Sequence, residues 1–189
     1  MAEQYKKFWH KSLWIAIGVF CIRCLFAKVL FNSAFSAYDL YGYAGETVGF
    51  SALLMLLYEK YIWKWKYNPF ESMPVLAESY SGYLKSSYDN KERSIKLKIK
   101  QSLLSVSVIM ETNESDSNSI SASIDKIQNV WQLTYTYLNV PNAEVRERSE
   151  IHYGTAFLSI ENPMLIKGHY YTDRKTTGDI QLKADRKGR

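Results

Sequence analysis

The hydrophobic pattern of the chain changes once, near residue 68. Before that point apolar residues form two long runs, Leu13–Phe31 and about Leu40–Trp63, separated by a short polar stretch. The first run spans 19 residues, close to the ~20 that an α-helix needs to cross a bilayer. Two helices joined by so few residues must be antiparallel neighbours. The pattern therefore predicts a transmembrane hairpin in residues 1–67, with helices at about 13–31 and 42–63.

A linker rich in proline, "NPFESMP" at 68–74, separates this hairpin from a section with a period of two. In "RSIKLKIKQ", Ile95, Leu97 and Ile99 alternate with lysines, the pattern of a half-buried strand. Turn signals such as "YDNKE", "TNESDSN" and "NVPNAE" separate similar runs. Strands are predicted near 76–86, 93–101, 103–111, 118–126, 130–139, 149–160, 164–172 and 178–184.

Consecutive strands with brief connections indicate an antiparallel meander. Eight strands in residues 75–189 suffice to close a small barrel, which also removes exposed sheet edges. A two-sheet sandwich is the alternative. The predicted fold is a membrane protein in which a two-helix transmembrane hairpin precedes an all-β, eight-stranded antiparallel barrel.

The charge distribution supports a membrane section. Residues 1–69 carry eight Lys and Arg against four Asp and Glu, whereas residues 70–189 carry sixteen against fifteen. The pI near 9.0 could suggest a nucleic-acid binder. However, the surplus lysines flank the hydrophobic runs, and the connecting stretch has only Asp39. The positive-inside rule then places both ends of the hairpin, and the barrel, in the cytoplasm.

A cleaved signal peptide is the competing interpretation of the N-terminus, since a basic start and an apolar stretch precede small residues. Two features disfavour it. The apolar run is longer than a usual signal core and contains Arg23, and a second hydrophobic segment follows at once. A membrane hairpin accounts for both features.

Arg23 stands near the centre of the first run. A charged residue there costs about 2.5–3.5 kcal/mol on insertion scales, so it rarely faces lipid unpaired. Glu46 in the second run lies within about one helical turn of the same depth. The two could pair within one hairpin and fix its register, or could line a polar seam when several hairpins associate. Lys28, near the outer end, can extend to the headgroups.

The sequence contains no motif that predicts an enzyme. Nucleophile elbows, phosphate-binding glycine loops and paired-carboxylate motifs are missing. Cys21 and Cys24 have a Cys-x-x-Cys spacing but no second ligand pair, which favours buried structural cysteines over redox or zinc chemistry. His152 and His169 are better explained as barrel residues than as metal ligands, because zinc needs three or four convergent ligands. No cofactor is expected.

The predicted barrel is rich in tyrosine, and its aromatic rings could stack on nucleobases. Arg93 and Arg174 could bind phosphate through paired hydrogen bonds. Tyrosine is also favoured in any sheet with one solvent-exposed face, so composition alone does not decide between ligand stacking and an ordinary structural role.

Three later segments, "LTYTYLNVPN", "HYGTAFLSI" and "LIKGHYYTDRKTTGDIQL", carry a family resemblance. With the N-terminal hairpin, they resemble the CD-NTase-associated protein 15 family, the SMODS-associating effectors with two transmembrane segments and a β-strand-rich domain. The resemblance spans nearly the whole chain. It is clearest over Leu133–Leu182, and the membrane half matches by architecture.

This resemblance implies a specific function. Such proteins are effectors of bacterial CBASS antiphage systems. A partner CD-NTase makes a cyclic oligonucleotide, expected here to be a cyclic dinucleotide, and the barrel binds it. The effector then assembles with copies of itself in the lipids of the inner membrane, whose failure kills the infected cell. DNA and RNA are not expected partners. The ligand contacts implied are Tyr135, Tyr137, His152, Thr155, Tyr170, Thr172 and Arg174.

Two other functions fit a membrane-tethered barrel. One is a lipocalin-like carrier of a lipid or hydrophobe, and the other is a scaffold whose filled barrel binds proteins. An apolar interior without basic groups would favour the carrier, and a solid interior would favour the scaffold. The interior of the barrel therefore discriminates among the three.

Overall fold

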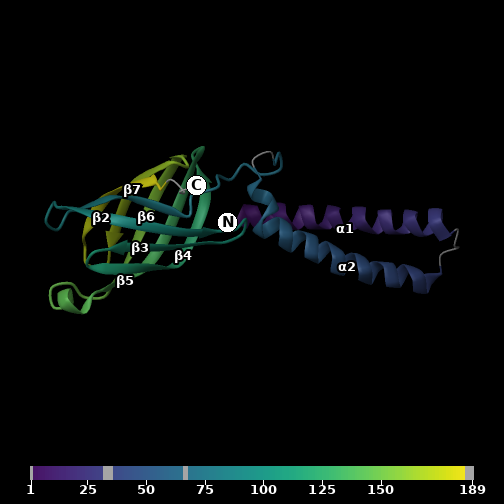
Figure 1. Cartoon of the computed structure of the whole chain (residues 1–189), viewed down its shortest axis with the longest axis horizontal. Helices are drawn as coiled ribbons and strands as arrows, with labels where there is room; N and C mark the ends of the chain where they lie inside the picture. Colours follow the sequence, from purple (N-terminus) through teal and green to yellow (C-terminus); the bar gives the residue numbers. More distant parts are fainter. Residues whose placement is uncertain (1, 32–35, 66–67, 186–189) are drawn as a thin grey trace. The chain divides into compact units, whose positions relative to one another are not determined.

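The computed structural model describes residues 2–31, 36–65 and 68–185 of the chain. It divides the chain into two compact units, residues 1–70 and 71–189. The predicted linker at 68–74 spans the boundary between them. The first unit is helical and the second is built from strands, and both are drawn in Figure 1.

The helical unit contains α1 (Ala2–Phe31), α2 (Ala37–Lys60) and the short 3-10 helix η1 (Ile62–Lys64). Both long helices are long and apolar enough to cross a membrane. The second begins earlier than predicted because Ser36 caps it. The Ser36 hydroxyl accepts from the backbone N–H of Asp39, whose carboxylate accepts from the backbone N–H of Ser36. This reciprocal capping box satisfies two of the free N–H groups at the helix start.

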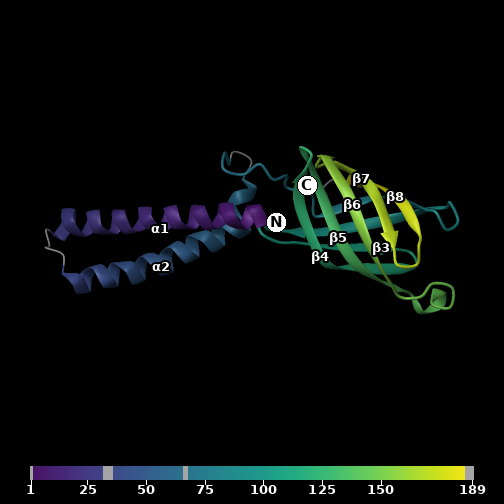
Figure 2. The same ribbon diagram turned by 180° about the vertical axis from the view of Figure 1, so that it is seen from behind.

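The strand unit is a closed barrel in which every strand pairs antiparallel with its neighbours in sequence, and β1 also pairs with β8. Figure 2 shows β5, β6, β7 and β8 side by side in one wall. The predicted barrel is confirmed, and the two-sheet sandwich is wrong. The strands are β1 (Ser79–Ser86), β2 (Glu92–Gln101), β3 (Val106–Thr112), β4 (Ser115–Ile127), β5 (Val130–Pro141), β6 (His152–Asn162), β7 (Leu165–Thr172) and β8 (Thr177–Ala184).

Three strands begin three residues later than the sequence pattern indicated, and the first of them, expected from 76, begins at Ser79. The third was expected from 103, but Ser102 and Ser105 form a turn in which the Ser102 hydroxyl accepts from the Ser105 backbone N–H. The sixth was expected from 149, but residues 142–151 form a loop that contains the 3-10 helix η2 (Ala143–Val145). This loop lines the candidate site described below.

The end of the barrel where β1 begins is filled. Tyr80 is fully buried there, and its hydroxyl donates to the backbone oxygen of Pro163 at 2.7 Å while accepting from the backbone N–H of Ala77 at 2.9 Å. Residues that alternate along the strands pack around it with almost no exposed surface, namely Leu97, Leu133, Leu158, Ile166 and Leu182. This half of the interior is a close-packed apolar core.

Candidate ligand-binding pocket

The opposite end of the barrel holds a pocket of about 330 Å³. It lies where β1, β3, β5 and β7 end, so the turns after these strands form its rim. Its charged side chains are Arg93, Glu114, Arg148 and Arg174. The rest of its lining is mainly polar or aromatic and comprises Leu84, Ser86, Tyr88, Met110, Thr112, Ser115, Ser117, Tyr137, Asn139, Val145, Ser149, His152, Tyr170, Thr172 and Thr176.

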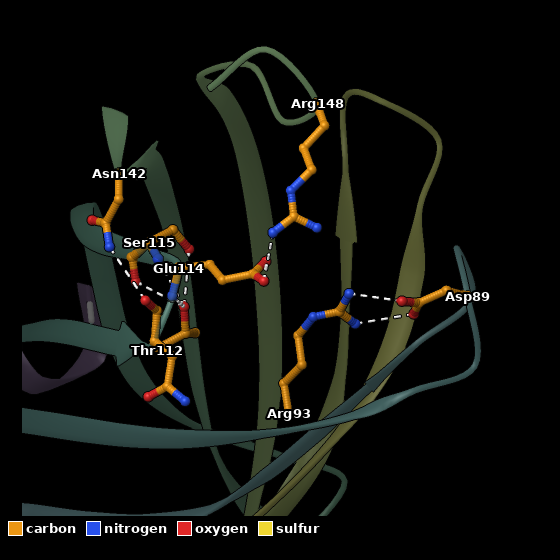
Figure 3. Close-up of polar contacts among 8 residues, drawn as sticks. Asp89, Arg93, Thr112, Glu114, Ser115, Asn142 and Arg148 are labelled. Carbon is orange, nitrogen blue, oxygen red and sulfur yellow. Dashed lines mark hydrogen bonds and ion pairs between the residues drawn. The ribbon is translucent and has the colours of Figure 1, made fainter. Parts of the chain in front are cut away.

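Arg93 extends from β2 and is held by Asp89 in the turn before that strand. Its two terminal nitrogens donate to the two carboxylate oxygens of Asp89 at 3.0 and 2.8 Å, a bidentate pair that Figure 3 shows. Hydrogen bonding from Arg93 lowers the pKa of Asp89 to about 2. The pKa of Arg93 is raised, chiefly by this hydrogen bond and further by the Asp89 and Glu114 charges. Arg93 therefore presents a fixed positive charge to the pocket.

Arg148 reaches the pocket from the loop at 142–151. Its Nη2 donates to Glu114 Oε1 at 2.7 Å, and in Figure 3 the guanidinium ends of Arg148 and Arg93 point toward one another. Glu114 lies in the turn between β3 and β4, where Thr112 Oγ1 accepts from its backbone N–H at 3.1 Å. The backbone N–H of Asn142 donates to the Glu114 carbonyl at 2.8 Å. The loop and the turn are thus joined by backbone and side-chain contacts.

Arg174, in the turn after β7, is the third arginine of the pocket. Its Nη1 donates to Ser149 Oγ at a long 3.4 Å. Within the part of the chain that the structure describes, Arg174 makes no ion pair, in contrast to Arg93 and Arg148. It is therefore the arginine most readily available to an anion.

Two tyrosine rings lie against glycines of the neighbouring strand. Tyr137 on β5 is paired with Gly154 on β6, and a Cβ at Gly154 would lie 2.4 Å from the Tyr137 ring. Tyr170 on β7 is paired with Gly178 on β8, where a Cβ would lie 2.6 Å from the ring. Because glycine has no side chain, Gly154 and Gly178 leave the space in which both rings lie along the barrel wall. An aromatic ring over a strand glycine is also a packing device that stabilises sheets.

Polar side chains of the pocket wall also have fixed hydrogen-bonding roles. Asn139 Nδ2 donates to the hydroxyls of Ser115 and Ser117 at 2.9 and 2.8 Å. His152 Nδ1 lies 2.9 Å from the Glu150 carbonyl oxygen, which can only accept, so Nδ1 carries the proton. Burial lowers the pKa of His152, which keeps the ring neutral at pH 7. Its Nε2 is therefore an acceptor.

Five of the seven ligand contacts suggested by the sequence line this pocket: Tyr137, His152, Tyr170, Thr172 and Arg174. Tyr135 faces the interior but lies outside the lining, with its ring centroid 5.7 Å from that of Tyr137. Burial raises the pKa of its phenol, and its buried hydroxyl has no hydrogen-bond partner among the described residues.

Thr155 points away from the pocket. Its neighbours along β6, Gly154 and Ala156, are buried, so the intervening side chain lies on the outer face of the barrel. There its hydroxyl lies 3.2 Å from that of Thr136 on β5. The sequence could not decide which face of β6 points into the barrel, because both faces are apolar. With its side chain on the outer face, Thr155 cannot contact a ligand inside the barrel.

Sequence reasoning missed several residues of the pocket. Asn139 continues the inward face of Tyr135 and Tyr137, so the alternation of β5 could have revealed it. Arg148 and Glu114 lie in turns, where no periodicity indicates a direction. Their charge in a loop was the only available signal.

In the helical unit, Arg23 Nε donates to Glu46 Oε2 at 2.6 Å, so the two residues pair within one hairpin, the first of the two arrangements that the sequence allowed. The Arg23 guanidinium also lies over the Tyr43 ring, 4.1 Å from its centroid. Lys28 is exposed near the end of α1. The charge at the centre of α1 is thus neutralised by α2.

Comparison with known proteins agrees with this geometry. Residues 72–184, which include the whole barrel, match the family model described as "Cap15, cyclic dinucleotide receptor domain". The chain is also 34% identical over 140 residues to a CD-NTase-associated protein 15 from Staphylococcus schleiferi, an alignment that covers 72% of this chain and 76% of that protein. The chain belongs to the CD-NTase-associated protein 15 family, and its barrel is the Cap15 cyclic dinucleotide receptor domain.

Proposed function

We propose that this protein is a membrane effector of a CBASS antiphage system, and that the barrel pocket binds a cyclic dinucleotide made by a partner CD-NTase. The observation that carries this proposal is the charge of the pocket. Three arginines and one glutamate line it, which gives a formal charge of +2. A cyclic dinucleotide has two phosphodiester groups and a charge of −2. Arginine binds phosphate oxygens through paired, charge-assisted hydrogen bonds.

The other lining residues suit the bases. Tyr137 and Tyr170 offer rings for stacking, which contributes ~1–3 kcal/mol per base in single-stranded complexes. The acceptor Nε2 of His152 can bind an N–H or O–H group of the ligand. The volume of about 330 Å³ lies at the lower end of the ~300–1,000 Å³ typical of small-molecule pockets.

The two alternative functions fit less well. A carrier of lipids or hydrophobes needs an apolar cavity, whereas this pocket contains three arginines and a row of hydroxyl and amide groups. A pure scaffold needs a solid barrel, but only the half of the interior around Tyr80 is filled. A basic, aromatic pocket over a packed core supports the nucleotide receptor.

We further propose that ligand binding drives self-association in the bacterial inner membrane, with both ends of the hairpin cytoplasmic, and that the assembly disrupts the bilayer. One face of α2 supports this step. Gly42, Gly45 and Gly49 have nothing within 4 Å of where a Cβ would be, so this face is open in the single chain. Gly45 and Gly49 form a Gly-x-x-x-Gly pattern, and such small-residue faces let membrane helices approach closely.

The test of the receptor proposal uses the full chain in lipid nanodiscs, titrated by calorimetry with cyclic di-AMP, cyclic di-GMP, cyclic GMP–AMP, cyclic UMP–AMP and a cyclic trinucleotide. At least one should bind, and Arg174→Ala and Tyr170→Ala should each weaken binding at least tenfold. Tyr171→Ala is the matched control, because Tyr171 is the neighbouring residue on the outer face of β7. If a folded protein binds none of these ligands, the receptor proposal is wrong.

A further inference from the structure

We propose that Glu114 is an internal competitor of the ligand: its carboxylate occupies Arg148 in the ligand-free protein, and a phosphate must displace it. This inference rests on the proposed function, since it concerns how the same pocket takes an anion. Glu114 repels the expected anionic ligand, and in this role it would set the affinity of the pocket for the cyclic dinucleotide.

The position of Glu114 is the first step. It is the one carboxylate among the residues that line the pocket, and its oxygen lies 2.7 Å from Arg148 Nη2. A carboxylate on a guanidinium uses the same donors that a phosphate would use. Ligand and Glu114 therefore compete for the same hydrogen bonds on Arg148.

The ion pair is accessible and weak, as a replaceable contact must be. The side chains of Arg148 and Glu114 are 64% and 45% exposed. Exposed ion pairs contribute a factor of about five or less to an equilibrium. A dianion that also contacts Arg174 can therefore displace Glu114 from Arg148. An anion that contacts Arg148 alone has less binding free energy with which to displace it.

The pair also holds the loop at 142–151 over the pocket. Glu114 binds Arg148 on one side of this loop, and Arg174 donates to Ser149 on the other. A ligand with two phosphates on Arg148 and Arg174 would replace both side-chain contacts. When phosphate groups replace Glu114 and Ser149 as partners of the two arginines, the loop at 142–151 would lose these side-chain contacts and be held by the ligand instead.

Arg93 gives an internal comparison. Its partner Asp89 makes a bidentate pair and lies outside the lining of the pocket. Asp89 therefore orients Arg93 from behind and leaves the ligand side open. Glu114 lies within the lining. The two carboxylates have the same chemistry but different positions, so their removal should have opposite effects on binding.

The experiment compares Glu114→Gln with wild type in the full chain in lipid nanodiscs, using whichever cyclic dinucleotide of the panel above wild type binds most tightly. Glutamine can still accept the hydrogen bond from Arg148 but carries no charge. We expect binding about two- to fivefold tighter at low salt, with a smaller gain at high salt because exposed charges are screened. Adding Arg148→Gln should reduce the gain. Asp89→Asn should weaken binding.

Glu111→Gln is the matched control, because Glu111 is ion-paired with Lys98 on the outer face of β2 and β3, and its removal should leave affinity unchanged. Glu114→Ala is the second variant should Glu114→Gln fold poorly, and the same direction is expected. If Glu114→Gln binds as wild type or more weakly, Glu114 only tethers the loop and the inference is wrong. If wild type binds no cyclic dinucleotide, the receptor proposal fails instead.

Discussion

Replacing Gly154 by alanine tests whether the pocket depends on the placement of the Tyr137 ring. The new Cβ would lie 2.4 Å from the ring, whereas ordinary contacts of a Cβ begin at 3.4 Å. The ring must therefore move by about 1 Å, and the contact is with a side chain, which can yield without breaking the barrel. Glycines 82 and 168 differ, because a Cβ there would meet the backbone of the neighbouring strand.

The expected loss of affinity follows from stacking. A base on an aromatic ring contributes ~1–3 kcal/mol, and a displaced ring keeps only part of this. We expect Gly154→Ala to weaken binding of the best cyclic dinucleotide by about 1–2 kcal/mol, or roughly five- to thirtyfold. Crowding in the barrel should also lower the free energy of unfolding by about 1–3 kcal/mol, measured by denaturant titration.

A double-mutant cycle with Tyr137→Ala separates ring displacement from general damage. If Gly154 acts through the ring, Gly154→Ala should cost little further affinity once Tyr137 is alanine. Calorimetry on the four proteins in nanodiscs measures this coupling. Equal losses of affinity in the presence and absence of the Tyr137 ring would refute the reasoning.

Three further predictions concern other parts of the chain. Arg23→Glu should reduce the amount of folded protein recovered from membranes, because it opposes two carboxylates, and adding Glu46→Arg should restore it; no rescue would exclude the pairing as the cause. Gly49→Leu should abolish cross-linking between copies while leaving the nucleotide affinity of single copies in nanodiscs unchanged, since the single hairpin has open space there, and persistent cross-links would exclude this face. Burial lowers the pKa of His152, so the unfolded chain binds its proton at higher pH than the folded chain. Stability should therefore be full above the ordinary pKa of about 6.5 and fall as the pH drops below it. Thermal unfolding at pH 8 and 5 should show a smaller difference in His152→Gln than in wild type, and an equal difference would contradict this assignment.

The architecture was predictable from the sequence because buried positions recur with the period of each secondary-structure element. Alternation along Ile95, Leu97 and Ile99 marks a strand with one buried face, and the same rule holds around the barrel. Likewise, an arginine among apolar residues required a partner at the same depth, and Glu46 is that partner. Both inferences rest on local rules of solvation, which sequence alone contains.

The pocket was only partly predictable, because the placement of its residues depends on contacts between segments that are distant in the sequence. Thr155 belongs to a strand with apolar residues on both faces, so its direction depends on the register with β5. Arg148 and Glu114 come together because two turns meet at the same end of the barrel. Such contacts depend on the closure of the sheet between β1 and β8, which no local pattern encodes.

The closed barrel limits how a ligand could change this protein. Every strand is paired on both sides, so the wall has no free edge and no hinge between strands. The core around Tyr80 fills the other end, which leaves the turns at the rim as the parts that can rearrange. A ligand shifts an equilibrium only through different affinities for two states. In this fold, those states must differ mainly at the rim, where Glu114 and Arg148 meet, and a signal for assembly would originate there.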